Sequence, residues 1–476
     1  MGAAQKIPLT TGAYQSRSLI ASAQRCVNLY MENNPKDSPF PTTHYPTPGL
    51  ITLGTAPNAS GWRQLFVASN SQCYGVAGNT VYQISSTYIC TAVGSIASVQ
   101  GYVSMVDNGV ELVIVDGSVN GFQVILATGV FSQITDPSFA GSSRVDFVDT
   151  YLVFNNPSIY SQWYISLSSV TTFDPLYFAS KQGYSDALVC CIVTKRLIWL
   201  LGTQTSEVWA NSGASDFPFQ IIDGIFEQHG CLAVGSVAQM DGSIYLLAQD
   251  AQGQAMVMQT VGYNMQKIST NAIDFAIQSY PIVSDAIGFT YQRDGHLFYV
   301  LNFPTADKTW VYDLASQQWH ERAWIDSNGQ FHRHRANCCV SFQGVNLVGD
   351  WQNGNLYSMD PNTYTDFGGP IVRVRSFPHM VDTGNRVKYS QFLADFEVGD
   401  GQGDNSAPPV SLRWSDDKGA TYGNRIEQSL GAEGQYQTTL AFQPLGIARD
   451  RVFELSWSTA ARTALNGAFI KAQPAN

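Results

Sequence analysis

Charged side chains are scarce in this chain of 476 residues, where they make up 13% of the sequence; about 25% is usual for a soluble domain. Basic residues are the scarcer sign, because 26 Lys and Arg stand against 37 Asp and Glu, a net charge of -11. This balance excludes the broad basic surface with which a protein grips phosphates nonspecifically. With 44% hydrophobic and 12% aromatic residues, the chain can bury a large core, which excludes disorder for most of it.

Long hydrophobic runs are also missing. The most apolar stretch, residues 187–202, is interrupted by Lys195 and Arg196, whereas a membrane-spanning helix needs about 18–20 apolar residues. The first six residues lack the apolar region of a secretory signal. We therefore expect no membrane insertion and, by default, a cytoplasmic protein. The eight cysteines include no C-x-x-C, so we expect reduced, mostly buried thiols.

Helical periodicity is nearly absent, and short strand-like runs alternate with turn dipeptides instead. Six of these turns, each followed by an apolar run, recur at intervals of 42, 45, 46, 53 and 50 residues, at positions 108, 150, 195, 241, 294 and 344. A period of about 40 to 50 residues with several strands per unit is typical of propeller blades. We predict an all-β fold with a β-propeller of six or seven blades over residues 60–370.

The two ends of the chain differ from this repeating part. Residues 1–59 are polar and rich in proline, with one strand-like run at Cys26–Tyr30, and predict an extended N-terminal arm with polyproline II character. A domain boundary is predicted at 370, because residues 1–370 hold 41 charges and residues 371–476 hold 22. The last segment alternates polar and apolar residues, and its length of about 100 residues suits a C-terminal β-sandwich domain.

Motifs of common hydrolases and nucleotide-binding proteins are missing from the sequence, which has no G-x-S-x-G, Walker A loop or H-E-x-x-H. The best metal candidate is His332 and His334 followed by Cys338 and Cys339, with His320 nearby. Adjacent cysteines on a strand point to opposite faces, so these groups would not converge on zinc as four tetrahedral ligands must. We predict no metal site and no cofactor.

One turn motif stands in the last segment, where the letters SDDKGATY at residues 415–422 resemble the Asp-box hairpin of sialidases. The residues assigned to this structural turn are Ser415, Asp417, Gly419, Thr421 and Tyr422. The aspartate would accept hydrogen bonds from the loop backbone, and the glycine would take a conformation that other residues avoid.

A sialidase needs more than one such turn: three arginines must converge on a carboxylate, and Asp-boxes must recur in the propeller. No Arg, Lys or His lies between Arg63 and Arg144. These absences disfavour a sialidase-like propeller glycoside hydrolase. That enzyme, or a glycan-binding module, is the alternative function.

Several runs, in this order along the chain, resemble the packaged-DNA stabilisation proteins of short-tailed bacteriophages. They are residues 101–105 (GYVSM), 113–117 (VIVDG), 199–202 (WLLG), 207–209 (EVW), 217–219 (FPF), 268–270 (IST), 364–368 (YTDFG), 412–417 (LRWSDD) and 445–455 (LGIARDRVFEL). The resemblance implies a structural protein of the virion tail, made in the host cytoplasm, and no enzyme. It implies a six-fold hub or nozzle ring that extends the DNA channel below portal and adaptor, retains packaged DNA and takes part in ejection.

The same resemblance implies the partners. They would be further copies of the chain, the head-to-tail adaptor ring, a tail needle or plug, tailspikes or fibres, and double-stranded DNA that passes without specific binding. All of the net charge of -11 lies before residue 371, and we expect it to surround the DNA channel, since basic residues there would hold the passing phosphates.

Residues 64–143 hold only four charged side chains, all acidic. Interface cores are depleted in Lys, Glu and Asp, so the early blades are expected to pack against neighbouring subunits. The sequence alone equally allows a β-rich protein that covers its surface with Ser, Thr, Asn and Gln.

Overall fold

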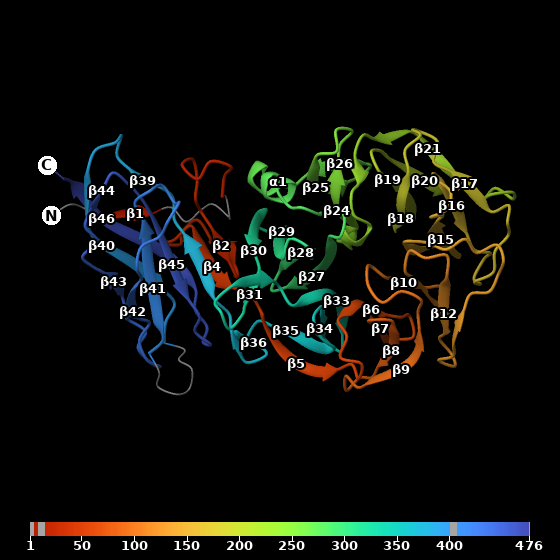
Figure 1. The fold of residues 1–476 in the computed structure, drawn as a ribbon, viewed down its shortest axis with the longest axis horizontal. Coiled ribbons are helices and arrows are strands. Elements are labelled where there is room, and N and C mark those ends of the chain that lie inside the picture. The colour runs from red at the N-terminus through yellow and green to blue at the C-terminus, as the bar shows by residue number, and fades with distance from the viewer. Residues whose placement is uncertain (1–3, 8–14, 400–406, 476) are drawn as a thin grey trace.

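The computed structural model describes residues 4–7, 15–399 and 407–475, and these residues are mostly β-strand (Figure 1). Within them there is one α-helix, α1 (Asn271–Gln278), and one 3-10 turn, η1 (Val234–Ser236). The Thr270 side chain caps α1 by accepting a hydrogen bond from the Ile273 amide, which satisfies a donor that the helix itself leaves unpaired. The predicted all-β fold is confirmed.

Seven antiparallel sheets of the described residues form propeller blades, one of the two numbers predicted (Figure 1). Blade 1 holds β6 (Trp62–Val67), β7 (Cys73–Ala77), β8 (Thr80–Ile84) and β9 (Cys90–Ser95). Blade 2 holds β10 (Ser104–Asp107), β11 (Glu111–Val115), β12 (Gly121–Ile125) and β13 (Phe131–Gln133). Blade 3 holds β14 (Val145–Val148), β15 (Tyr151–Asn155), β16 (Gln162–Ile165) and β17 (Phe178–Ser180). Blade 4 holds β18 (Leu188–Thr194), β19 (Leu197–Gly202), β20 (Ser206–Asn211) and β21 (Phe219–Glu227).

The remaining three blades depart slightly from this pattern. Blade 5 holds β22 (Gly230–Cys231), β23 (Ala238–Met240), β24 (Ser243–Gln249), β25 (Ala255–Val261) and β26 (Asn264–Lys267). Its two short first strands, β22 and β23, both pair with β24. Blade 6 holds β27 (Ile287–Arg293), β28 (His296–Phe303), β29 (Lys308–Asp313) and β30 (Gln318–Glu321). Blade 7 holds β33 (Ala336–Phe342), β34 (Val345–Asp350) and β35 (Asn355–Asp360), and its outer strand is β5 (Gly49–Thr55) from near the N-terminus.

The six turns of the sequence repeat each connect two neighbouring antiparallel strands near the start of blades 2 to 7. Asp241 and Gly242 have φ of 51° and 66°, and Asp294 and Gly295 have φ of 49° and 82°. Two consecutive residues with positive φ are the geometry of the tight hairpin turn that suits twisted strands. The spacing of these turns therefore reports the spacing of the blades.

The C-terminal strands, blue in Figure 1, form a sandwich of two sheets together with red strands from the N-terminus. The first sheet contains β3 (Leu29–Asn33), β4 (Thr42–Pro46), β46 (Leu465–Pro474), β40 (Val387–Phe396) and β43 (Leu440–Phe442), with β1 (Ala4–Ile7) and β44 (Ile447–Ala448) attached. The second contains β38 (Arg373–Ser376), β45 (Asp450–Trp457), β41 (Pro409–Ser415) and β42 (Ile426–Ser429), with β39 (Met380–Val381) attached.

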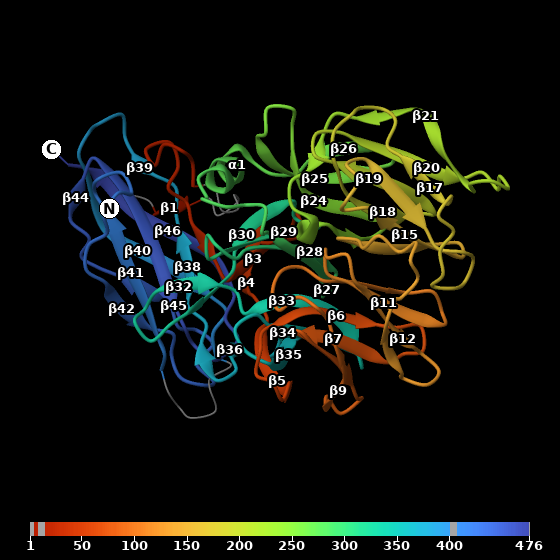
Figure 2. The ribbon, with the colours of Figure 1, turned by 45° about the vertical axis from the view of Figure 1, so that its right-hand side comes forward.

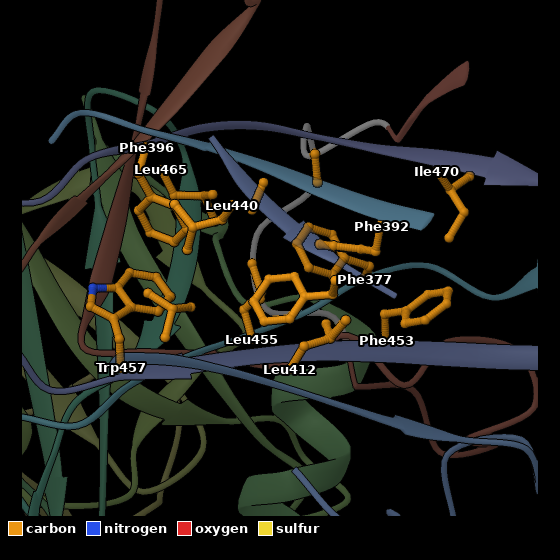
Figure 3. Close-up of a cluster of buried hydrophobic side chains, with 14 of the residues drawn as sticks. Phe377, Phe392, Phe396, Leu412, Leu440, Phe453, Leu455, Trp457, Leu465 and Ile470 are labelled. Carbon is orange, nitrogen blue, oxygen red and sulfur yellow. The ribbon is translucent and has the colours of Figure 1, made fainter. Parts of the chain in front are cut away.

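Aromatic and aliphatic side chains fill the space between these sheets, as Figure 3 shows. The rings of Phe392 and Phe453 lie 5.1 Å apart, and those of Phe396 and Trp457 lie 5.0 Å apart. Strands β40 and β45 place these side chains on the inner faces of the two sheets, which is the source of the alternation seen in the sequence.

The propeller and the sandwich share a continuous sheet. The short strand β2 (Cys26–Val27) pairs in parallel with β30 of blade 6, through Val27 and Glu321, and antiparallel with β38 of the sandwich. Two further small elements lie at this junction: the hairpin of β31 (Ala323–Ile325) and β32 (Phe331–Arg333), and the pair β36 (Thr365–Asp366) and β37 (Gly369–Pro370). Strand β36 pairs in parallel with β5 and so extends the sheet of blade 7 toward the sandwich.

The N-terminal segment differs from the extended arm that its prolines predicted. Of residues 1–59, those at 1–3 and 8–14 lie outside the described part. In the rest, β2, β3 and β4 belong to the sandwich and its junction with blade 6, and β5 completes blade 7 (Figure 2). Proline is tolerated at strand ends, and Pro46 is the last residue of β4 while Pro48 directly precedes β5. The proline content therefore did not prevent strand pairing.

Candidate functional site

Hydrogen bonds between the starts of blades 2, 3 and 5 close the axis of the propeller. The Arg144 guanidinium, just before β14 of blade 3, donates to the Val237 carbonyl before β23 of blade 5 at 2.9 Å. The same Nη1 donates to the Tyr102 hydroxyl before blade 2 at 3.1 Å. Since these contacts cross the centre of the ring, the propeller's own axis is not a passage for a DNA duplex.

Beside this closed point lies a cavity of about 810 Å³, lined by the segments that lead into the first strands of blades 1, 2, 5, 6 and 7. Its arginines hold loops together. The Arg63 guanidinium donates to four backbone carbonyls between Gly78 and Gly101 at 2.8–2.9 Å. Arg333 stacks on the Trp351 ring at 4.1 Å and donates to the Asn337 side chain. Burial lowers the pKa of Arg63 and of Arg333 to about 10, so both stay charged at neutral pH.

Blades 1 and 2 expose aliphatic side chains in their turns. Between 51 and 66% of the surface of each is exposed, and the residues are Ile89, Val99, Val110, Val119 and Val130. Val110 and Val130 lie in the β10–β11 and β12–β13 turns, which antiparallel pairing places at the same end of blade 2. These side chains fall within residues 64–143, which hold only four charged side chains.

The predicted turn at 415–422 follows β41 in the sandwich. The Ser415 hydroxyl donates to Asp417 at 2.6 Å and accepts from the Gly419 amide at 2.8 Å. Asp417 also accepts from the Thr421 amide at 2.8 Å and from the Thr421 hydroxyl at 2.6 Å. These hydrogen bonds, led by that from Ser415, lower the pKa of Asp417 to about 2. Gly419 has φ of 89°, and the Tyr422 ring lies under the Arg413 guanidinium at 4.7 Å.

The candidate metal ligands do not converge. His332 pairs with two carboxylates, its Nδ1 lying 2.6 Å from Asp307 and its Nε2 lying 3.5 Å from Asp326. His334 is buried, and its Nδ1 accepts from the Ala336 amide at 3.2 Å. The described residues contain no group of three or more His, Cys, Asp or Glu side chains arranged to hold a metal ion. The thiol of Cys338 is buried, which raises its pKa.

The contacts that join the propeller to the sandwich were missed from the sequence. Arg25 forms a two-pronged ion pair with Glu321, at 3.0 and 3.1 Å. The Asn28 amide group donates to the carbonyls of Ala323 and Val372 at 2.9 and 2.8 Å. The sequence marked only the strand-like run around Asn28, because these partners lie about three hundred positions further along the chain.

No helix of the described residues has the length and apolar character needed to cross a membrane. Two family models match the chain: one described as bacteriophage P22 Gp10, beta-propeller, over residues 5–364, and one described as bacteriophage P22 Gp10, beta-sandwich, over residues 373–473. No curated protein matches the chain. Among solved structures, the WD40 β-propeller domain of Doa1 is similar, with a TM-score of 0.40 and 11% identity over 66% of this chain and 98% of that domain's chain.

Proposed function

The chain belongs to the family of bacteriophage P22 Gp10 and is a phage structural protein, and from this premise we propose that it forms the hub or nozzle ring of a short tail. In this proposal the ring, of six copies, extends the DNA channel below the portal and adaptor, retains packaged DNA and takes part in its ejection. The observation that carries the proposal is that the two family models match the propeller and the sandwich in order and together span most of the chain.

The closed propeller axis supports a channel built between subunits. Arg144, Tyr102 and Val237 occupy the centre of the propeller, so DNA would have to pass along a surface of each subunit. All of the net charge of -11 lies before residue 371, and an acidic wall repels phosphates. We propose that the propeller faces the channel with this charge. Changing channel-facing acidic residues to Lys should slow ejection, and unchanged ejection rate and DNA retention would count against this placement.

The exposed aliphatic turns of blades 1 and 2 support contacts between subunits. Exposed hydrophobic surface in a segment with few charges is typical of the cores of protein interfaces. Val110 and Val130 lie at one end of blade 2, and we propose that they are buried in the ring. The double change V110D/V130D should leave the monomer folded and weaken the assembly of copies.

The remaining partners follow from the family and complete the proposal. They are the head-to-tail adaptor ring, a tail needle or plug, and tailspikes or fibres, with double-stranded DNA passing without specific binding. The protein would be made in the host cytoplasm and reside in the virion tail. We propose no catalytic role, and a structural role for the turn of Ser415, Asp417, Gly419, Thr421 and Tyr422.

The proposal is tested by the mass of the purified 52.1 kDa chain, measured alone and with its adaptor ring. We expect a closed complex of six copies in the presence of the adaptor. A strict monomer that ignores the adaptor would overturn the hub assignment.

A further inference from the structure

A cleft of about 400 Å³ opens between the propeller and the sandwich, and four segments distant in sequence line it. Strands β3 and β4 supply one wall, and the β27–β28 turn of blade 6 supplies another. Residues 361–364, after β35, and Arg462 of the sandwich complete it. The cleft exists only where the two parts of the molecule meet, which is a common place for a binding site. Figure 2 shows β3 and β4 between the two parts.

Tyrosine rings and prolines form the apolar surface of this cleft. The Tyr30 ring lies 5.9 Å from the Tyr45 ring, and edge contacts with Phe298 at 5.6 Å and His296 at 5.1 Å hold it in place. Pro46 and Pro48 add rigid backbone to the same wall. The tyrosine rings are therefore flat surfaces held in position before any ligand arrives.

The polar lining carries both signs of charge in equal number. Glu32 and Asp294 supply two carboxylates, and Arg293 and Arg462 supply two guanidinium groups. Each of these charged groups also has a polar partner within the protein, and Arg462 lies 3.6 Å from Glu397 of the sandwich. The Nε of Arg293 is buried without a hydrogen-bond partner and lies 3.5 Å from Asp294. The Glu32 carboxylate lies 3.9 Å from His296, whose other ring nitrogen is paired with Asp313 at 2.8 Å.

We propose that this cleft binds an uncharged saccharide. A pyranose ring has an apolar C–H face that fits a tyrosine ring, and hydroxyls on its rim that both donate and accept. Carboxylates and guanidinium groups together satisfy such hydroxyls. An anionic ligand would meet Glu32 and Asp294, and the balanced lining gives it no net attraction. A proline-rich peptide offers chiefly carbonyl acceptors, which would pair with the two guanidinium groups and leave both carboxylates without a donor.

The site goes beyond the proposed tail function and does not depend on it. The test is saturation-transfer NMR on the full chain with maltohexaose, cellohexaose and N-acetylchitohexaose at millimolar concentration. We expect saturation of at least one of them, strongest at the ring C–H protons. Tyr45→Ala should weaken the affinity roughly tenfold by removing a stacking surface. Glu32→Gln, at a side chain that is 48% exposed, keeps the shape and should weaken it less.

The matched control is Tyr263→Ala, at a tyrosine that is 46% exposed in the β25–β26 turn and outside the cleft. It should leave saturation unchanged, and thermal unfolding of all three variants should match the parent protein. Absence of saturation with all three hexasaccharides would overturn the proposal. Equal loss in the control variant, or binding of a proline-rich decapeptide in place of the sugars, would also overturn it.

Discussion

Replacement of Asn28 by Asp tests the junction between propeller and sandwich with the smallest change of shape. Asn28 is buried, with 1% of its surface exposed, and has φ of 56°. Its side-chain nitrogen donates to two carbonyls, and its Oδ1 accepts from the Ala323 amide at 2.9 Å. An ionised carboxylate keeps the acceptor and loses both donors, so the carbonyls of Ala323 and Val372 would face an oxygen.

The magnitude follows from the two carbonyls left without a donor. A buried group that loses its partner costs about 1–3 kcal/mol, so the variant should lose about 3 kcal/mol at pH 7. Burial against carbonyl oxygens should raise the pKa of the introduced carboxyl above its unfolded value of about 3.9. The destabilisation is therefore largest above the folded pKa and shrinks as the pH falls toward 4, because the protonated acid donates again.

Asn28→Gly is the matched control, because glycine accepts the positive φ and removes all three side-chain hydrogen bonds. Its loss should also be about 3 kcal/mol, but independent of pH. The assay is urea unfolding at pH 7 and pH 5, with hydrogen exchange at the Ala323 amide, which should quicken more in the glycine variant because that variant also loses the acceptor of this amide. A loss below about 1 kcal/mol in Asn28→Asp, or equal losses at both pH values, would refute this account of the junction.

Three further predictions concern the core, a buried histidine and the predicted turn. Trp62→Ala should lower the free energy of unfolding by about 3–5 kcal/mol in urea, because the fully buried Trp62 donates to the Gly354 carbonyl at 2.8 Å and so links blades 1 and 7. A loss under about 1 kcal/mol would contradict this packing. Burial, with nearby arginines, holds the pKa of His334 well below 6.5. The contribution of the neutral His334 to the free energy of unfolding is therefore present above pH 6.5 and lost below it, so the stability of His334→Gln should be less sensitive to acid by about 1.4 kcal/mol per pH unit. Parallel stability profiles of the two proteins from pH 7 to 5.5 would refute this. Gly419→Ala should cost at least about 1 kcal/mol, because Gly419 has φ of 89° and an added Cβ would lie 2.6 Å from the Cβ of Ala23. Unchanged thermal unfolding of the variant would show that this position accepts a side chain and would refute the prediction.

The propeller could be predicted because its signals are local. A hairpin turn such as Asp241-Gly242 is encoded by two residues, and the apolar runs beside it are encoded by the next five or six. Because this unit repeats along the chain, the sequence indicates propeller blades even though it does not specify how each strand pairs with the next. The turn at 415–422 was readable for the same reason, since Ser415, Asp417 and Gly419 contact one another within four positions.

The N-terminal strands and the cleft could not be predicted, because their partners are distant in sequence. β5 pairs with β35 about three hundred residues later, and nothing in the composition of residues 49–55 specifies that partner. The prolines near 46–48 indicated an extended conformation, which is common to polyproline II and β-strand. The limits of the predicted domains at 59/60 and 370/371 stay predictions, although the two family models meet between residues 364 and 373.

The cleft between propeller and sandwich combines both difficulties. Tyr30 and Tyr45 belong to the predicted arm, Arg293 to a blade turn and Arg462 to the sandwich. Each is ordinary in its own stretch of sequence, and only the fold brings them together. The same holds for Arg144, whose position at the closed propeller axis depends on the order of the blades.

We propose that this phage structural protein retains packaged DNA as part of the tail. The most direct measurement is the DNA content of particles assembled with and without the chain, followed over time after packaging. We expect that heads lacking the chain fill and then lose their DNA, and that adding the purified protein before the loss prevents it. Particles that lack the chain and remain stably filled and infectious would contradict it.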